Sequence, residues 1–162
     1  MIENNTAAKI GGGICADNSI IESYAKITNN SAKEHGGGVD LDNSTFILQG
    51  GEISYNTAGM TPSNFNHYGG GISISNSNTE NQDNIIINDG IIQGNISIIG
   101  GGIGYSFLEA YEKPNQPRII MNGGTICNNG YTVEKDGSLT NICFEGGGIY
   151  GSYVAVSYTH LR

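Results

Sequence analysis

The chain has 162 residues, the length of one ordinary domain, with 26 glycines, three prolines and no tryptophan. Isoleucine occurs 24 times and leucine five times. This favours strands over helices, because β-branched side chains are stiff at χ1 and suit pleated surfaces. A formal net charge of -8, with seven scattered basic residues, argues against nucleic acid as a partner. The sequence contains no apolar run long enough for a membrane span and no secretory signal at residues 1–6, so a targeting segment of a secreted protein would lie outside it.

The three cysteines, Cys15, Cys127 and Cys143, lie in no Cys-x-x-Cys or Cys/His ligand spacing. Neither a zinc site nor a disulfide framework is therefore indicated, and no cofactor is expected. We expect the cysteines to be unpaired small apolar residues. Because their number is odd, at least one thiol is free or bonded to another chain, and whether two of them pair stays open.

A repeat organises the chain. Three glycines followed by a β-branched residue occur five times, at residues 11–14, 36–39, 69–72, 100–103 and 146–149. An Ile-x-x-Asn block precedes each of them, at residues 2–5, 27–30, 53–56, 92–95 and 126–129. An apolar triplet lies between each glycine block and the next Ile-x-x-Asn block, at residues 20–22, 46–48, 85–87 and 119–121.

One period thus holds three short strands and three corners, and the shortest period is 25 residues. Strands that recur once per period can pair with their counterparts one period away, at about 4.8 Å. Parallel crossovers are right-handed in nearly all proteins. The sequence therefore predicts an all-β, right-handed parallel β-helix, a solenoid of about five coils with three short strands per coil.

Alternation along the strands predicts which side chains face the core, since residues two apart share a face. In the glycine strands these are Ile14 with Ala16, Val39 with Leu41, Ile72 with Ile74, and Ile103 with Tyr105. In the triplets the outer members are predicted to point inward, and Glu22 breaks that rule. The middle members Ile21, Ile47, Ile86 and Ile120 then form an outward apolar stripe, which is either a docking face or, as we favour, a stack of strand-forming residues.

Asparagine and glycine suit the corners, because Gly adopts positive φ freely and Asn tolerates it. Stacked corners are expected to stack their amides into ladders. One ladder is predicted from Asn5, Asn30, Asn56, Asn95 and Asn129, and a second from Asn18, Asn43 and Asn76. Structural roles are likewise predicted for Gly13, Gly38, Gly71, Gly102 and Gly148. The sequons at Asn4, Asn29, Asn43 and Asn95 are interpreted as by-products of this composition, not as glycosylation sites.

Insertions lengthen two of the corners and leave the repeat blocks intact. They fall at residues 75–84 and 104–118 after the glycine strand, and at residues 59–68 and 130–145 at the other corner. We expect loops that lie side by side on neighbouring coils and form a ridge, which is a candidate contact surface. Its candidate partner-binding residues are Tyr105, Phe107, Tyr111, Phe65 and Tyr68.

The predicted organisation is a β-helix at residues 1–153, uncapped at both ends, followed by a tail at residues 154–162. Residues 155–162 carry none of the repeat blocks and read like translated sequencing-adapter sequence, so they are left out of the fold prediction. The chain is then expected to be part of a longer protein, in which further coils would cover the open strand edges.

The alternating Gly-Gly-Gly-Ile and Ile-x-x-Asn blocks, over about residues 2–150, resemble the repeats of bacterial surface β-helix proteins. These are polymorphic outer-membrane-protein-type adhesins, autotransporter passengers and large cell-wall adhesins, whose blocks read Gly-Gly-Ala-Ile and Phe-x-x-Asn. Here Gly13 stands at the alanine position and Ile27 at the phenylalanine position. The resemblance implies an adhesin-like protein at the bacterial cell surface or outside the cell, and it names no ligand.

Many parallel β-helices cleave polysaccharides with paired carboxylates. Asp40 and Asp42 are predicted to share a strand face, and Asp17 aligns with Asp42 one coil away, so these three are weak calcium candidates. Ser75 and Ser106 occupy the aligned positions in later coils, and the lyase arginine and the hydrolase Asn-Thr-Asp, Asp-Asp and Gly-His-Gly sets are missing. No catalytic or cofactor-binding residue is therefore predicted. His35 and His67 are interpreted as solvated corner residues.

These observations favour a non-catalytic, adhesin-like or structural solenoid that displays loops to a surface glycan or protein. Neighbouring coils of the full-length chain are the other expected partner. The alternative from a different class is part of a carbohydrate-active β-helix enzyme, a polysaccharide lyase or hydrolase, whose catalytic coils lie outside this chain.

Overall fold

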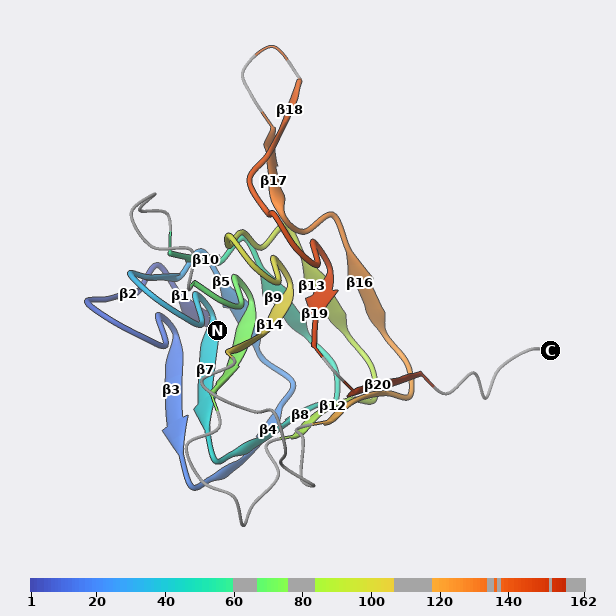
Figure 1. Ribbon diagram of the computed structural model, residues 1–162. Helices are drawn as coiled ribbons and strands as arrows, with labels where there is room; N and C mark the ends of the chain where they lie inside the picture. The colour runs from blue at the N-terminus through green and yellow to red at the C-terminus, as the bar shows by residue number, and fades with distance from the viewer. Residues whose placement is uncertain are drawn as a thin grey trace, which may run out of the picture.

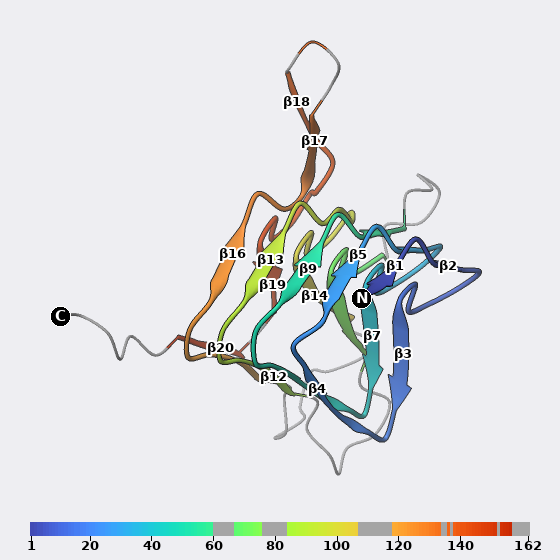
Figure 2. The ribbon, with the colours of Figure 1, turned by 180° about the vertical axis from the view of Figure 1, so that it is seen from behind.

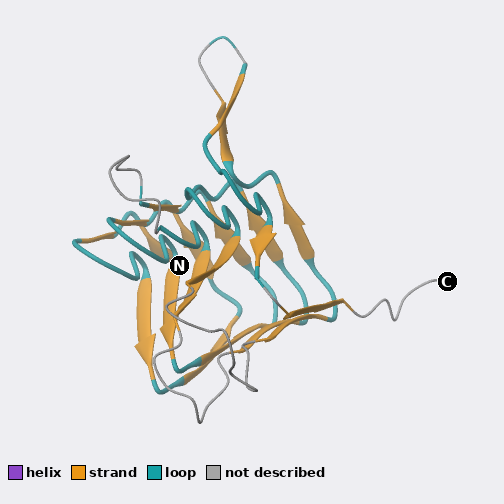
Figure 3. Cartoon of the chain, in the orientation of Figure 1, coloured by secondary structure: helices purple, strands orange, loops and turns teal. Residues whose placement is uncertain are grey.

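The computed structural model describes residues 1–59, 67–75, 84–106, 118–133, 136, 138–151 and 153–156. Within these residues the structure consists of short strands and connecting turns, without helix (Figure 3). The strands stack coil on coil from β3 at one end of the column to β16 and β20 at the other (Figure 1). The prediction of a right-handed parallel β-helix is confirmed.

Three five-stranded parallel sheets form the walls of the column. The asparagine sheet, built from the Ile-x-x-Asn blocks, contains β1 (Ile2–Glu3), β5 (Lys26–Thr28), β9 (Glu52–Ser54), β13 (Ile91–Gln93) and β16 (Thr125–Cys127). The glycine sheet contains β3 (Ile14–Asp17), β7 (Val39–Asp42), β11 (Ile72–Ser75), β14 (Ile103–Ser106) and β19 (Ile149–Tyr150). The apolar sheet contains β4 (Ile20–Ser23), β8 (Thr45–Leu48), β12 (Asn84–Ile87), β15 (Arg118–Met121) and β20 (Tyr153–Val156).

Two further sheets were not predicted. A short parallel ladder joins β2 (Thr6–Ala7), β6 (Ser31–Ala32) and β10 (Thr57–Ala58), directly after the ladder asparagines. An antiparallel hairpin, β17 (Tyr131–Val133) with β18 (Leu139–Asn141), occupies the region that we predicted to be a plain loop. The hairpin rises from the side of the column (Figures 1 and 2).

The register follows the repeat blocks. Val39 lies between Ile14 and Ile72 in the glycine sheet, and Ile53 lies between Ile27 and Ile92 in the asparagine sheet. Equivalent residues are therefore stacked directly over one another. The inward faces predicted for the glycine strands and for the later triplets are confirmed, because their residues, such as Leu41 and Phe46, pack into one continuous core.

The first coil differs from the prediction by one residue. Ile21 pairs with Phe46 and Glu22 with Ile47, so the inward residue is Ile21, and Glu22 belongs to the outward stack. The link from β4 to β5 has two residues, Tyr24 and Ala25, whereas the later links have three and include a glycine at positive φ. The later triplets begin seven residues before the isoleucine of the next strand. Because the first link is one residue shorter, the same spacing places the first triplet one residue too early. The outward stripe consists of Ile47, Ile86 and Ile120, which are half-buried, and begins at the exposed Glu22.

The tail prediction was also wrong at its boundary. Strand β20 pairs in register with β15, with Val154 opposite Ile119 and Val156 opposite Met121. The solenoid backbone therefore continues through residue 156, beyond the predicted end at residue 153. Residues 157–162 lie outside the described part of the chain.

The third glycine of each block is required because the coils approach closely there. A Cβ atom at Gly38 would lie 2.6 Å from the Gly71 carbonyl oxygen and 3.0 Å from Nδ2 of Asn56. The equivalent positions Gly13, Gly71 and Gly102 show the same approach to the next coil, at 2.7, 2.6 and 2.5 Å. At Gly148, by contrast, the nearest atom is Cγ2 of Ile126 at 3.7 Å. The structural role predicted for these glycines is therefore confirmed for the first four, whereas the position of Gly148 has room for a Cβ atom.

We predict that Gly38→Ala destabilises the protein and that Gly148→Ala does not. The first substitution forces a methyl group against a backbone carbonyl, and overpacking of this kind costs roughly 1–3 kcal/mol. The second adds a methyl group at an ordinary contact distance and should change the free energy of unfolding by less than about 0.5 kcal/mol. Urea denaturation of both variants measures the difference, and equal losses of stability would contradict the assigned coil contact.

Candidate functional site

The asparagine ladder is the most extensive polar array in the described part of the column. Nδ2 of Asn56 donates to Oδ1 of Asn95 in the next coil at 3.0 Å and to the Ile27 carbonyl of the preceding coil at 3.0 Å. The backbone N–H of Asn56 donates to the same Oδ1 at 2.9 Å. The amides of Asn5, Asn30 and Asn95 make the equivalent contacts to the next coil, and Asn129 is the last acceptor. The predicted ladder is confirmed, and its role is to fix the stacking distance.

The ladder asparagines do not themselves adopt positive φ. The preceding residue does so in every coil: Asn4, Asn29, Tyr55, Gly94 and Asn128 have φ between 54° and 63°. This left-handed residue turns the next amide inward, where it meets its neighbours. In the second ladder, Asn18 and Asn43 do adopt positive φ, as expected, and Nδ2 of Asn43 donates to Oδ1 of Asn18. Asn76 lies outside the described residues.

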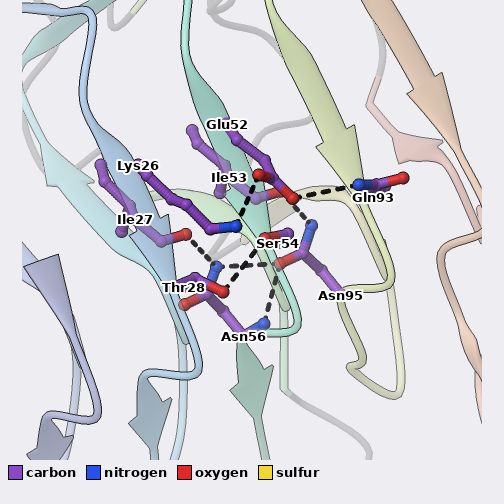
Figure 4. A network of polar contacts seen from close by, with 9 residues as sticks. All are labelled: Lys26, Ile27, Thr28, Glu52, Ile53, Ser54, Asn56, Gln93 and Asn95. Atoms are coloured by element: carbon purple, nitrogen blue, oxygen red, sulfur yellow. Dashed lines mark hydrogen bonds and ion pairs between the residues drawn. The ribbon is translucent and has the colours of Figure 1, made fainter. Parts of the chain in front are cut away.

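A charged group lies on the outer surface of the asparagine sheet (Figure 4). Glu52 forms an ion pair with Lys26 at 2.9 Å and accepts a hydrogen bond from Nε2 of Gln93 at 3.0 Å. These hydrogen bonds, that of Gln93 first and that of Lys26 second, lower the pKa of Glu52 to about 2. The three residues come from successive coils, so the group links strands and offers no unpaired carboxylate to a ligand.

The acidic residues of the glycine sheet are brought together as predicted, but their environments differ. Asp17 and Asp42 are register partners on the outer face, and Asp17 is exposed. Asp40 is 1% exposed, and its Oδ1 accepts a hydrogen bond from Ser73 in the next coil. Burial raises the pKa of Asp40, and its Oδ2 has no hydrogen-bond partner. Among the described residues, no group of three His, Cys, Asp or Glu side chains is close enough to hold a metal ion.

Cys15 is the register neighbour of Asp40 and is exposed. Its pKa is raised by partial burial and then by the nearby Asp40, Asp17 and Asp42 carboxylates. A raised pKa disfavours the thiolate, which is the reactive form. Cys127 and the buried Cys143 likewise form no disulfide within the chain.

The histidines do not fit the solvated positions that we predicted. His67 is 6% exposed, and both of its ring nitrogens lack hydrogen-bond partners. Nδ1 of His35 accepts a hydrogen bond from the backbone N–H of Tyr68 at 3.2 Å, and the two histidine ring centroids are 6.2 Å apart. Desolvation lowers the pKa of His35. Two imidazole rings therefore fill this corner, next to the triple-glycine turns.

Two of the predicted partner-binding residues are buried. Tyr105 faces the core at 6% exposure, and Tyr68 is 9% exposed beside His35 and Tyr150. The burial of both rings is incompatible with surface contact. Tyr105 lies within strand β14, which continues through Ser106 past the predicted start of the loop, so its predicted place on the inward face with Ile103 is confirmed and its predicted role in partner binding is wrong. Phe65, Phe107 and Tyr111 lie outside the described residues.

The hairpin and its neighbour Phe144 lie in the insertion at residues 130–145, which was predicted as a loop of the candidate contact surface; the strand pairing and the exposure of Phe144 were not predicted. The backbone N–H groups of Ile142 and Cys143 both donate to the Gly130 carbonyl, which closes the base of the hairpin at 3.1 and 3.0 Å. Gly130 itself donates to the Asn95 carbonyl at 2.8 Å, so the chain leaves and rejoins the column without losing register. Phe144 is 75% exposed at this base. A single aromatic residue between repeat blocks gives no signal in the sequence that separates it from a core residue.

Searches against models of protein families, curated proteins and solved structures found no match to this chain. The described residues include no helix with the length and hydropathy of a membrane span. The argument about function therefore depends on the geometry of the column and its projections.

We predict that Asn95→Ala is much more destabilising than Asn5→Ala. The first substitution leaves the N–H and Nδ2 of Asn56 without their acceptor in the buried ladder, and each orphaned group costs about 1–3 kcal/mol. Asn5 is exposed at the end of the ladder, where water replaces the lost bonds, so we expect less than about 1 kcal/mol. Urea denaturation gives the two values. Native-state hydrogen exchange should show lost protection at the Asn56 amide in Asn95→Ala alone.

We predict that Asp40→Asn stabilises the protein at neutral pH. The pKa of Asp40 is higher in the folded than in the unfolded chain, so the wild-type protein loses stability as the pH rises from the unfolded value through the folded one. The neutral amide avoids that loss and can still accept a hydrogen bond from Ser73. The gain should be largest at neutral pH and should vanish below about pH 4, the unfolded pKa of Asp. Thermal unfolding across this range measures it, and a gain that does not depend on pH would contradict the assignment to burial of the charge.

Proposed function

We propose that the chain is a non-catalytic, adhesin-like solenoid of the cell surface or the extracellular space, which presents side projections to a surface glycan or protein. The observation that carries the proposal is the β17–β18 hairpin, which stands away from the column (Figure 2). Phe144, which follows the hairpin at its base, is exposed. A rigid column that carries lateral projections suits display, because recognition residues are commonly held on loops by a rigid scaffold.

The base of the hairpin suits a contact site because it is anchored and also exposes an aromatic ring. The backbone of Phe144 is tied to the column by a hydrogen bond from its N–H to the Ile98 carbonyl at 2.8 Å. An exposed ring on an anchored backbone loses little conformational freedom on binding. Aromatic side chains are enriched among the residues that dominate binding energy, and they combine a large apolar face with defined geometry.

The environment of the acidic residues supports the non-catalytic part of the proposal. A glycosidase needs a carboxyl group that reaches the scissile bond, whereas Asp40 is buried and bonded to Ser73. Asp17 and Asp42, the aligned pair, have Ser75 and then Ser106 as the register partners in the following coils. No described residue favours the alternative of a polysaccharide lyase or hydrolase over display, and a direct assay distinguishes the two.

We predict that the protein binds at least one probe on a printed glycan array or among immobilised fibronectin and collagen, and that Phe144→Ala weakens this binding about tenfold or more, the effect expected for an aromatic hot spot. Tyr24→Ala is the matched control, because Tyr24 is 72% exposed but lies on the link between the apolar and asparagine sheets. It should leave the affinity unchanged. Equal losses in both variants would contradict a site at the hairpin base. Release of reducing or unsaturated sugars from pectin or alginate would contradict the non-catalytic role and support the alternative.

A further inference from the structure

Tyr55 has a backbone conformation that tyrosine rarely adopts. Its φ is 54°, in the left-handed region, and every other non-glycine residue with positive φ in the described part of the chain is an asparagine. Asparagine or glycine stands at the equivalent corner of the other coils, as Asn4, Asn29, Gly94 and Asn128. A bulky residue with positive φ is an outlier, and such outliers are concentrated at functional sites. The corner itself favours asparagine, so the fold does not explain the tyrosine.

The ring of Tyr55 is an exposed platform on the wall of the column. A Cβ atom at Gly94 in the next coil would lie 2.6 Å from both Cδ1 and Cε1 of Tyr55, so the ring lies against this glycine. The residue is nevertheless 57% exposed. Tyr55 directly follows β9, the central strand of the asparagine sheet, which has two strands on either side. Coils therefore flank the ring in both directions, and its exposure belongs to the wall.

Polar side chains border this ring on the outer surface of the asparagine sheet (Figure 4). Glu52 begins the strand that Tyr55 follows, and the N–H of Tyr55 donates to the Gln93 carbonyl at 3.1 Å. The pKa of Lys26 is raised by the hydrogen bond and the charge of Glu52 and then by Tyr55, which places the phenol near this amine. The Lys26–Glu52–Gln93 group and the Tyr55 ring thus form one surface.

This polar group is held in place by bonds between its own members. The Glu52 carboxylate accepts from Lys26 at 2.9 Å and from Gln93 at 3.0 Å. Ser54 shares the face of Glu52, because the two are two residues apart on one strand. Its hydroxyl donates to that of Thr28 at 3.1 Å, and both residues are buried. Side chains that are already ordered lose little conformational freedom when a ligand binds.

The chemistry of the surface favours an uncharged ring that carries hydroxyl groups. The charges of Lys26 and Glu52 cancel, so the group does not favour an ion over a neutral molecule. Gln93 has two N–H donors, of which one is bonded to Glu52, and an ionised carboxylate has about four acceptor positions. Neighbouring hydroxyls of a sugar can use such a donor and acceptor together. A pyranose also has a C–H face, whose weakly positive hydrogens suit the negative face of an aromatic ring.

We propose that Tyr55 and the Lys26–Glu52–Gln93 group form a binding subsite for a neutral pyranose of an oligosaccharide. The sugar stacks its C–H face on the Tyr55 ring, and its hydroxyls bond to Gln93 and Glu52. This subsite lies on the wall of the asparagine sheet and does not rest on ligand binding at the base of the hairpin.

Isothermal titration calorimetry of the full chain with cellohexaose, mannohexaose, xylohexaose and chitohexaose tests the subsite. At least one of these neutral oligosaccharides is expected to bind with a Kd of about 1 mM or lower. Tyr55→Asn removes the ring and should weaken this binding about tenfold or more. Tyr55→Phe keeps the stacking face and should stay within about threefold of the wild type. Gln93→Ala removes one neutral hydrogen bond and should weaken binding about threefold to tenfold.

Tyr24→Asn is the matched control and should bind like the wild type. Tyr24 is 72% exposed, and its ring also lies near a glycine of the next coil, with Cδ1 3.7 Å from a Cβ atom placed at Gly50. It precedes the asparagine sheet, whereas Tyr55 follows it. Thermal unfolding separates binding from packing. Tyr55→Asn should unfold at the same temperature as the wild type or higher, because asparagine tolerates positive φ.

The proposal is overturned if none of the four oligosaccharides binds, if Tyr55→Asn binds as tightly as the wild type, or if this variant unfolds at a markedly lower temperature. Tighter binding of the anionic hexagalacturonate would overturn the assignment to a neutral sugar. Binding of a proline-rich peptide and of no oligosaccharide would overturn the ligand class. A hairpin base that binds no partner changes none of these outcomes, so the two proposals fail separately.

Discussion

The structure depends on the translation of one coil onto the next at the spacing of paired strands. Every wall strand pairs with its counterpart one coil away, so the backbone groups of one coil are satisfied by the coils on either side. The same translation stacks the isoleucines, closes the distance between triple glycines and aligns the amides of the ladder. A change in the rise of any coil would break all three sets of contacts together, which explains why blocks of fixed spacing persist through insertions of different length.

The ladder and the glycines fix the spacing between coils in two ways, by attraction and by close contact. Each ladder amide pulls neighbouring coils together through its bonds to Oδ1 and to the isoleucine carbonyl. The glycine carbonyls, which leave no room for a Cβ atom, show that the coils have reached their closest approach. The left-handed residue before each asparagine connects the two features, because it turns the amide inward just before the chain enters the glycine corner.

The features that depart from the repeat include the hairpin and two buried polar side chains. The hairpin at residues 131–141 leaves and rejoins the column through Gly130, so an excursion of this length costs no register. The buried Asp40 and His67 hold polar groups without full partners, which is unusual in a folded interior and lies outside the repeat pattern.

The sequence by itself determined the architecture, because in-register strands require equal spacing, and that spacing is legible in the Gly-Gly-Gly-Ile and Ile-x-x-Asn blocks. It also determined the inward residues and the members of the asparagine ladder, since alternation along a strand has a fixed period. Only the tertiary structure decided the register of Ile21, the pairing of β20 and the burial of Tyr68 and His67. These depend on the length of a link, on a backbone partner and on what packs against a side chain, and none of them repeats along the chain. The hairpin and Phe144 likewise occur once, so no period in the sequence could indicate them.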